Sequence, residues 1–262
     1  MSARRVYAIM LRYLLGMRHD LPRLMDVFYW PLIDLFVWGF LTVYLNQLRG
    51  PGYLALSWLI GGIIFWTLLY RSSQDVAVQL LDDIWARNFL NLFASPLQLS
   101  EFVVALLVVA ALKVFVTFVV LAVLAYAFYA FNVLALGPSL LPFLLVLLVF
   151  GWAMGLVVSA LMVRFGSRMQ IFAWGAAFFI QPVSAVFYPV ASLPPALQVV
   201  AHANPVTYVF EGMRAVLLER SFAVDQLLLA LLLTAASLAF SIWLFVVYFD
   251  QARERGMLAR LD

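Results

Sequence analysis

The chain has 262 residues, of which 66% are hydrophobic and 11% charged, and its mean hydropathy is +1.04. A soluble domain has about 45–50% apolar and about 25% charged residues, so this composition excludes one and indicates a protein that lies in a bilayer. Sixteen basic residues exceed thirteen acidic ones. Most of them stand at the ends of apolar segments, so nucleic acid is not an expected partner. The absence of cysteine excludes disulfides, thiolate metal sites and cysteine nucleophiles.

The first 25 residues predict an amphipathic helix that stays in the mature protein. They carry five arginines and lack the continuous apolar core of a signal peptide. Apolar residues recur at spacings of four and three, at Met10, Leu14, Met17, Leu21 and Leu24. A basic face beside such a stripe suits a helix in the inner membrane interface, drawn to anionic lipid headgroups. A plain topology signal is the alternative.

Six apolar segments are long enough to cross a bilayer, since a helical span needs about 20 mostly apolar residues. They are 27–45, 53–70, 102–131, 140–163, 169–190 and 224–249. With both termini in the cytoplasm, twelve arginines fall inside and three outside, as the positive-inside rule requires. The sequence therefore predicts an all-α polytopic membrane protein with six transmembrane helices, forming one domain over 1–262.

Two charged residues fall within these predicted spans, Asp34 in the first and Lys113 in the third. An unpaired charge at the bilayer centre costs about 2.5–3.5 kcal/mol on insertion scales. An ion pair between Asp34 and Lys113 is the preferred hypothesis, because each charge would offset the desolvation of the other. Proton coupling through Asp34, as in an ion-coupled secondary carrier, is the alternative.

Residues 72–100 are predicted to form the one sizeable cytoplasmic loop, with a helix inside it. Helical periodicity is given by Leu81, Trp85, Phe89 and Leu92. The Ser95-Pro96 pair is expected to end this helix, because proline disfavours the helical conformation in the residue before it.

The predicted fourth span contains a row of small residues, Gly151, Gly155 and Ser159, spaced four apart. Such a row permits close contact between helices. Packing within the fold is preferred over a role in dimer formation.

Residues 191–222 are too polar and too often broken to be another span, and they predict an outer re-entrant helical hairpin before the last one. Each of the prolines at 189, 194, 195 and 205 removes a backbone donor. Irregular chain in lipid would leave polar groups unsatisfied unless protein or water covers them. Glu211 and Arg214 are three residues apart and are expected to pair on one helix face, either to fix the hairpin or to contact substrate.

Several kinds of chemistry have no support in the sequence. An ATP-binding loop needs the pattern G-x-x-x-x-G-K-[ST], and the chain's only lysine, Lys113, follows no glycine loop. The two histidines, His19 and His202, belong to no zinc-binding pattern, so no metal site is expected. No G-x-S-x-G nucleophile pattern is present, and membrane enzyme chemistry is not expected.

Two ordered motifs resemble the type-2 family of ATP-binding-cassette (ABC) membrane permeases. Near the last span come an aromatic residue before Pro189, then Leu-Pro-Pro ending at Pro195, Asn204-Pro205, Tyr208, and Glu211-x-x-Arg214. The stretch NLFASPLQLSEF, residues 91–102, is similar to the family's segment of a helix, Ser-Pro and a glutamate that introduces the third span.

The resemblance implies a permease dimer above two ATPase subunits, which hold ATP and Mg, while this chain binds no cofactor. It also implies that the predicted cytoplasmic helix docks on the ATPase as a coupling helix. The candidate coupling residues are Leu81, Asp82, Asp83, Trp85, Arg87 and Phe89. The first, second and fifth spans would border the substrate path, with candidates Phe28, Tyr29, Trp30, Trp38, Phe65, Trp66, Phe178, Phe179, Gln181 and Phe187. Aromatic residues also pack cores and form interfacial belts, which is the alternative for each of them.

The function expected from this resemblance is ATP-driven export of a hydrophobic or amphipathic substrate across a plasma membrane of the bacterial inner-membrane kind. Drug-like molecules, lipids and lipid-linked glycans fit that description. A polysaccharide exporter of the same family is one alternative, although the first span lacks the basic-Tyr pattern associated with that branch. An ion-coupled secondary carrier using Asp34 and a membrane scaffold without cargo are the others.

Overall fold

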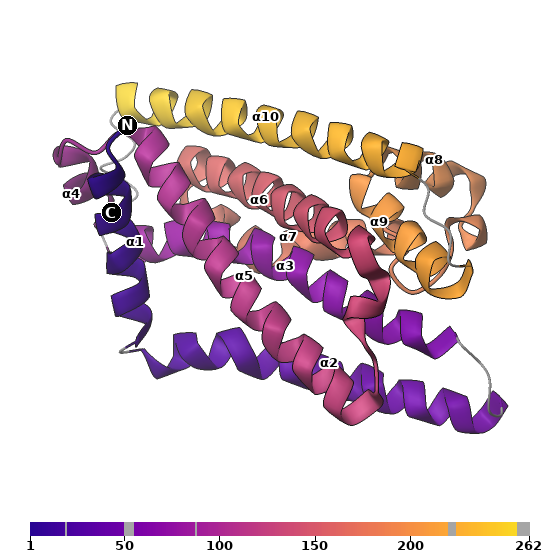
Figure 1. Cartoon of the computed structure of the whole chain (residues 1–262). Helices are drawn as coiled ribbons and strands as arrows, with labels where there is room; N and C mark the ends of the chain where they lie inside the picture. Colours follow the sequence, from indigo (N-terminus) through magenta and orange to yellow (C-terminus); the bar gives the residue numbers. More distant parts are fainter. Residues whose placement is uncertain (19, 50–54, 87, 220–223, 256–262) are drawn as a thin grey trace.

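The computed structural model describes residues 1–18, 20–49, 55–86, 88–219 and 224–255, and over these ranges the chain is helical with no strand. Four helices of the described chain are long and apolar enough to cross a membrane, over Met25–Leu48, Leu99–Tyr129, Val133–Phe165 and Val224–Glu254. The long helices lie side by side (Figure 1). The N-terminus, α4 and the last turns of α10 share one end of the molecule, here named the α4 end, while α8 and α9 occupy the opposite, hairpin end.

The first 25 residues form two helices rather than the single predicted one. Helix α1, Ala3–Arg18, crosses the α4 end and packs on the start of α5, burying Val6 and Ile9. Helix α2, Leu21–Arg49, then begins a new direction. Pro22 lies in its first turn, where the missing N–H costs nothing, whereas inside a continuous helix it would break a hydrogen bond.

Helix α3, Ala55–Trp85, corrects the predicted boundary between the second span and the cytoplasmic loop. Residues 72–85, predicted to be loop, continue this helix. They contain no proline or glycine, and Val76, Leu80 and Ile84 bury a helical stripe in the core. The helix packs against α2, α5, α6 and α7, so it is the central element of the bundle. Helix α3 is not among the four helices that are long and apolar enough to cross a membrane, so the second transmembrane span stays a prediction.

The fifth predicted span, 169–190, is not one helix. Helix α7, Ile171–Ile180, passes into a short 3-10 turn at Gln181–Val183, and irregular chain follows up to a second turn at Val190–Ser192. Pro182 cannot donate to a helical ladder, and Ala185 takes a left-handed conformation at φ 54°. The apolar helical part, Ile171–Val183, is shorter than a complete span.

The region before the last helix is a helical hairpin, as the proline pattern predicts. Its arms are α8, Pro195–Ala203, and α9, Pro205–Arg214, which meet at Asn204. A π-helical turn, Ala215–Glu219, follows α9, and α10, Val224–Glu254, returns to the α4 end. Residues 220–222 of the predicted hairpin lie outside the described residues.

The small-residue row of α6, Leu140–Phe165, packs inside the chain, which confirms the preferred hypothesis. A Cβ atom added at Gly151 would come within 2.5 Å of the Ser72 Cβ of α3. One added at Gly155 would come within 2.6 Å of the Ser73 carbonyl oxygen. The Ser72 hydroxyl also donates to the Leu148 carbonyl at 2.7 Å, so α3 and α6 lie in close contact along this row.

Candidate functional site

The predicted pair of Glu211 and Arg214 is present, with Arg214 Nη2 2.9 Å from Glu211 Oε1. Arg214 is 6% exposed, and its Nη1 donates to the Ala185 carbonyl at 2.7 Å. Glu211 Oε1 accepts from the Val190 N–H at 2.7 Å. Both side chains of the pair therefore also bond the irregular backbone that follows α7, so the pair connects α9 to that segment.

Asn204, the N-cap of α9, and Thr207 in its first turn complete this attachment. Asn204 caps the helix by accepting from the Val206 N–H at 3.1 Å, and its amide donates to the Ser184 hydroxyl at 2.9 Å. Thr207 donates to the Val183 carbonyl at 3.3 Å. Side chains of α9 thus satisfy the polar groups that the proline-broken segment cannot pair within a helix.

At the α4 end, helix α4, Phe89–Ala94, is a short separate element between α3 and α5, Leu99–Tyr129. Ser95 is extended, with ψ at 165°, and its hydroxyl donates to the Leu92 carbonyl at 2.5 Å. Glu101 accepts from the Gln98 N–H at 3.0 Å and closes a capping box at the start of α5. The prediction that Ser95-Pro96 ends the helix is confirmed.

Helix α1 is bound to both neighbours of α4. The Nη2 atom of Arg12 donates to both carboxylate oxygens of Asp83 at the end of α3, at 2.6 and 2.8 Å, and the Tyr13 hydroxyl donates to the same carboxylate. Burial, together with the Asp83 charge, raises the pKa of Tyr13 well above its usual range, so the phenol remains a donor.

The second attachment of α1 is to the start of α5. Glu101 accepts from the Ser2 backbone N–H at 2.6 Å and lies 3.5 Å from the Arg5 guanidinium. Arg5 also donates to the Pro96 carbonyl. Helix α1 therefore links the two segments on either side of α4.

The six candidate coupling residues do not share one exposed face. Leu81 is fully buried, Asp83 is held by α1, Asp82 is partly buried and Trp85 is exposed. Arg87 and the side chain of Phe89 lie outside the described residues. The described exposed surface of the short helix and its exit is Asn91, Ala94, Ser95 and Pro96, which the periodicity did not single out. The Ser-Pro break marks this segment in the sequence.

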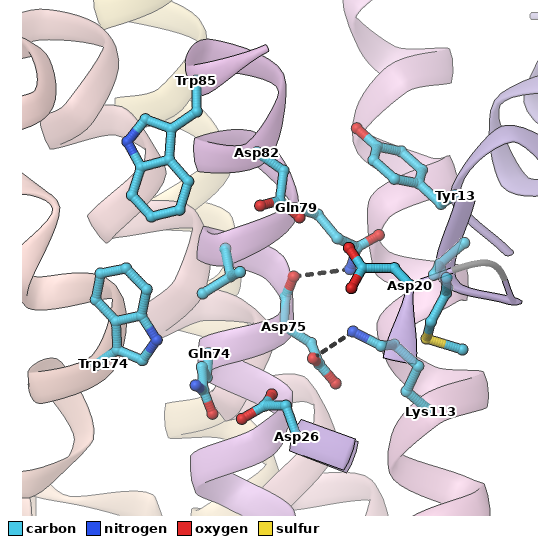
Figure 2. Close-up of a pocket in the computed structure, with 13 residues that line it drawn as sticks. Tyr13, Asp20, Asp26, Gln74, Asp75, Gln79, Asp82, Trp85, Lys113 and Trp174 are labelled. Carbon is cyan, nitrogen blue, oxygen red and sulfur yellow. Dashed lines mark hydrogen bonds and ion pairs between the residues drawn. The ribbon is translucent and has the colours of Figure 1, made fainter. Parts of the chain in front are cut away.

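A cavity of about 370 Å³ lies beside α3, and the other residues that line it come from α1, α2, α5, α7 and the α1–α2 turn. Figure 2 shows Trp85 and Trp174 on one side, Tyr13, Asp20 and Lys113 on the other, and α3 side chains between them. Its residues are Tyr13, Met17, Asp20, Asp26, Gln74, Asp75, Val78, Gln79, Asp82, Trp85, Val109, Lys113 and Trp174. Over the described chain, no group of three or more metal-ligating acidic or histidine side chains is arranged to hold a metal ion.

The predicted ion pair between Asp34 and Lys113 is wrong. The Nζ atom of Lys113 lies 2.6 Å from Asp75 Oδ1 instead. Asp75 is 5% exposed and projects from the part of α3 that was predicted to be loop. A second pair joins Arg71 of α3 to Asp26 of α2 at 2.7 Å, and Arg71 also donates to Gln74 at 3.2 Å. Asp34 is exposed on α2.

The candidate path aromatics divide into core and surface residues. Phe65 and Trp66 are 0% and 3% exposed, and the Phe65 ring packs edge-on against Phe143 of α6. Trp38 stacks on Phe187 with ring centroids 4.1 Å apart. Phe28 and Gln181 are partly buried, and the exposed residues of the set are Tyr29, Trp30, Phe178 and Phe179.

These features define a class of protein, a polytopic helical membrane protein. At the α4 end a short helix stands between two long ones, and at the hairpin end a helical hairpin is bonded to the segment that follows α7. A family model described as ABC-2 type transporter matches residues 6–218. The chain belongs to that family and is a membrane subunit of an ABC transporter. Comparison with curated proteins gives no match.

Proposed function

We propose that this chain is the permease subunit of an ATP-driven exporter, working as a homodimer with two separate ATPase chains that bind ATP and Mg. The observation that carries the proposal is α4, a six-residue helix at the end of the molecule that also holds the N-terminus. It stands within the residues matched by the ABC-2 family, so a docking role on an ATPase is the function it fits best.

The attachments of α1 supply a route from that helix to the bundle. The Arg12–Asp83 pair holds the end of α3, and the Arg5–Glu101 pair holds the start of α5. A displacement of α4 by an ATPase would be transmitted to both long helices at once, because α1 joins them. Movement of α3 would then reach α2, α5, α6 and α7, which pack on it.

The cargo is a hydrophobic or amphipathic molecule, such as a drug-like compound, a lipid or a lipid-linked glycan, carried across a bacterial plasma membrane. Exposed aromatic side chains on α2 and α7, among them Trp30, Phe178 and Phe179, suit a path at the dimer centre. Trp66 packs against Phe178, with ring centroids 6.2 Å apart, and supports that surface from the core.

Affinity purification of the tagged protein in mild detergent tests the proposal. Wild type is expected to retain a stoichiometric ATPase, and an Asn91→Arg, Ala94→Arg variant on the exposed face of α4 is expected to lose it. Asp250→Arg, exposed on α10 in its last turns, is the matched control for added charge at the same end. A folded wild-type protein that carries no ATPase, yet transports cargo, would contradict the proposal and favour an ion-coupled carrier.

A further inference from the structure

We infer that the cavity beside Trp85 and Trp174 binds an organic cation with an apolar body. That this ligand is the cargo rests on the proposed export function, whereas the binding site itself does not. The cavity combines an unpaired buried acceptor, carboxylates and two aromatic faces, and each of these favours a cation that carries N–H donors.

The acceptor is the side-chain carbonyl of Gln79, a residue that is 5% exposed. Its amide nitrogen donates to the Asp75 backbone carbonyl at 2.7 Å, which orients the group. Its Oε1 atom is buried and has no hydrogen-bond partner among the described residues. A buried acceptor without a donor is costly, so a ligand N–H at this position would remove an existing penalty.

The charge of the lining disfavours an anion. Among the described residues that line the cavity are four carboxylates, from Asp20, Asp26, Asp75 and Asp82, and one ammonium, from Lys113. Lys113 holds Asp75, and Arg71 holds Asp26 from α3. An ionised carboxylate has about four acceptor sites, so a residue that already has one partner can still accept from a ligand.

The two tryptophans form the apolar wall. Their ring centroids are 6.0 Å apart with an interplanar angle of 26°, and they are 54% and 38% exposed. Trp85 ends α3 and Trp174 lies on α7 (Figure 2). The two rings therefore form a wall in which α3 and α7 meet. Tryptophan faces attract cations through the ring quadrupole and also cover the apolar part of such a molecule.

The test is a fluorescence titration of the purified chain, without any ATPase, in lipid nanodiscs. The probe is ethidium, a planar cation with two amino groups, and the comparison probes are uncharged Nile red and the anion anilinonaphthalene sulfonate. We expect saturable ethidium binding that exceeds binding of both other probes. Removing the acceptor in Gln79→Leu, or the aromatic face in Trp174→Leu, should each raise the ethidium Kd about threefold to tenfold.

Two variants keep the test decisive. Trp174→Phe retains an aromatic face and should stay within about twofold of wild type, whereas Trp174→Leu, at a half-exposed position that tolerates either side chain, should not. Trp243→Leu, 59% exposed on α10, is the matched control and should leave the Kd unchanged. Equal affinity for ethidium and Nile red, or equal effects of Trp174→Leu and Trp243→Leu, would overturn the inference.

This measurement is separable from the test of export. Loss of the cation site with an ATPase still co-purifying would leave the permease function standing and remove only the cargo class. Specific ethidium binding without an associated ATPase would leave the cavity standing and remove the ATP-driven exporter.

Discussion

The two ends of the molecule use charged side chains in opposite ways. At the hairpin end, Arg214 and Glu211 bond the backbone of the broken segment after α7, at Ala185 and Val190. At the α4 end, Arg12 instead pairs mainly with a side chain, Asp83, on another helix. At the hairpin end the charged pair completes the backbone of one broken segment, whereas at the α4 end the charges of Arg12, Asp83 and Glu101 join α1 to α3 and α5 and bond backbone only in part.

The difference follows from the state of the backbone. A helix satisfies its own N–H and C=O groups, so charges beside it are available to link it to neighbours. Irregular chain in apolar surroundings has groups that only other side chains can satisfy. We therefore expect the hairpin end to behave as a fixed unit and the α4 end to hold bonds that can be exchanged when helices move.

The largest expected effect comes from removing the hairpin arginine. Arg214→Met leaves the Ala185 carbonyl and the Glu211 carboxylate without their donor, and should lower the free energy of unfolding by about 3–5 kcal/mol. Glu211→Gln keeps an acceptor for the Val190 N–H but leaves the buried Arg214 guanidinium without its counter-charge, and should cost about 3 kcal/mol. Thermal unfolding in detergent measures both. Equal unfolding temperatures for Arg214→Met and wild type would contradict the stated difference between the hairpin end and the α4 end.

Breaking the pair between α5 and α3 should have the next largest effect. Lys113→Met leaves the Asp75 carboxylate buried and should cost about 2–3 kcal/mol, while Lys113→Met combined with Asp75→Leu should recover most of that loss. Asp34→Asn is the control for the pairing that the structure does not contain, and its effect should add to that of Lys113→Met. A double-mutant cycle of unfolding free energies measures which residue couples to Lys113. Coupling of Lys113 to Asp34 instead of Asp75 would contradict the structure.

The contact between α3 and α6, which joins the two ends, can be tested with two glycines. Gly155→Ala drives a methyl group against the Ser73 carbonyl and should destabilise the protein by about 1–3 kcal/mol. Gly175→Ala on α7 meets no atom within 4 Å and should be neutral or stabilising by up to about 1 kcal/mol. Unfolding midpoints in detergent compare them. Indistinguishable midpoints would show that α6 does not pack on α3 this closely.

The smallest expected effect is at the α4 end. Tyr13→Phe removes one donor from Asp83 but leaves the ion pair with Arg12, and should cost about 0.5–1.5 kcal/mol. Tyr7→Phe, 60% exposed on the same helix, is the control. If ATPase binding is coupled through α1, Tyr13→Phe should also weaken co-purification of the ATPase, while Tyr7→Phe should not. A loss as large as that of Arg214→Met would remove the distinction between the ends.

Much of the candidate site could be read from local sequence. The proline pattern predicted the hairpin, because each proline removes a donor at a known place. The spacing of Glu211 and Arg214 predicted their pair, because residues three apart meet on one helix face. The cavity could not be predicted, since its walls come from α1, α2, α3, α5 and α7 and meet only when those helices pack.

The sequence by itself determined the class of protein and most of its helices, because apolar length and proline position are local properties of the chain. It also determined the family, through motifs that keep their order. Only the tertiary structure decided that α3 continues to Trp85, and therefore that Lys113 meets Asp75 rather than Asp34. Depth along a span can be counted in residues, but the partner of a buried charge depends on which helices are neighbours and how each is rotated, and packing alone sets both.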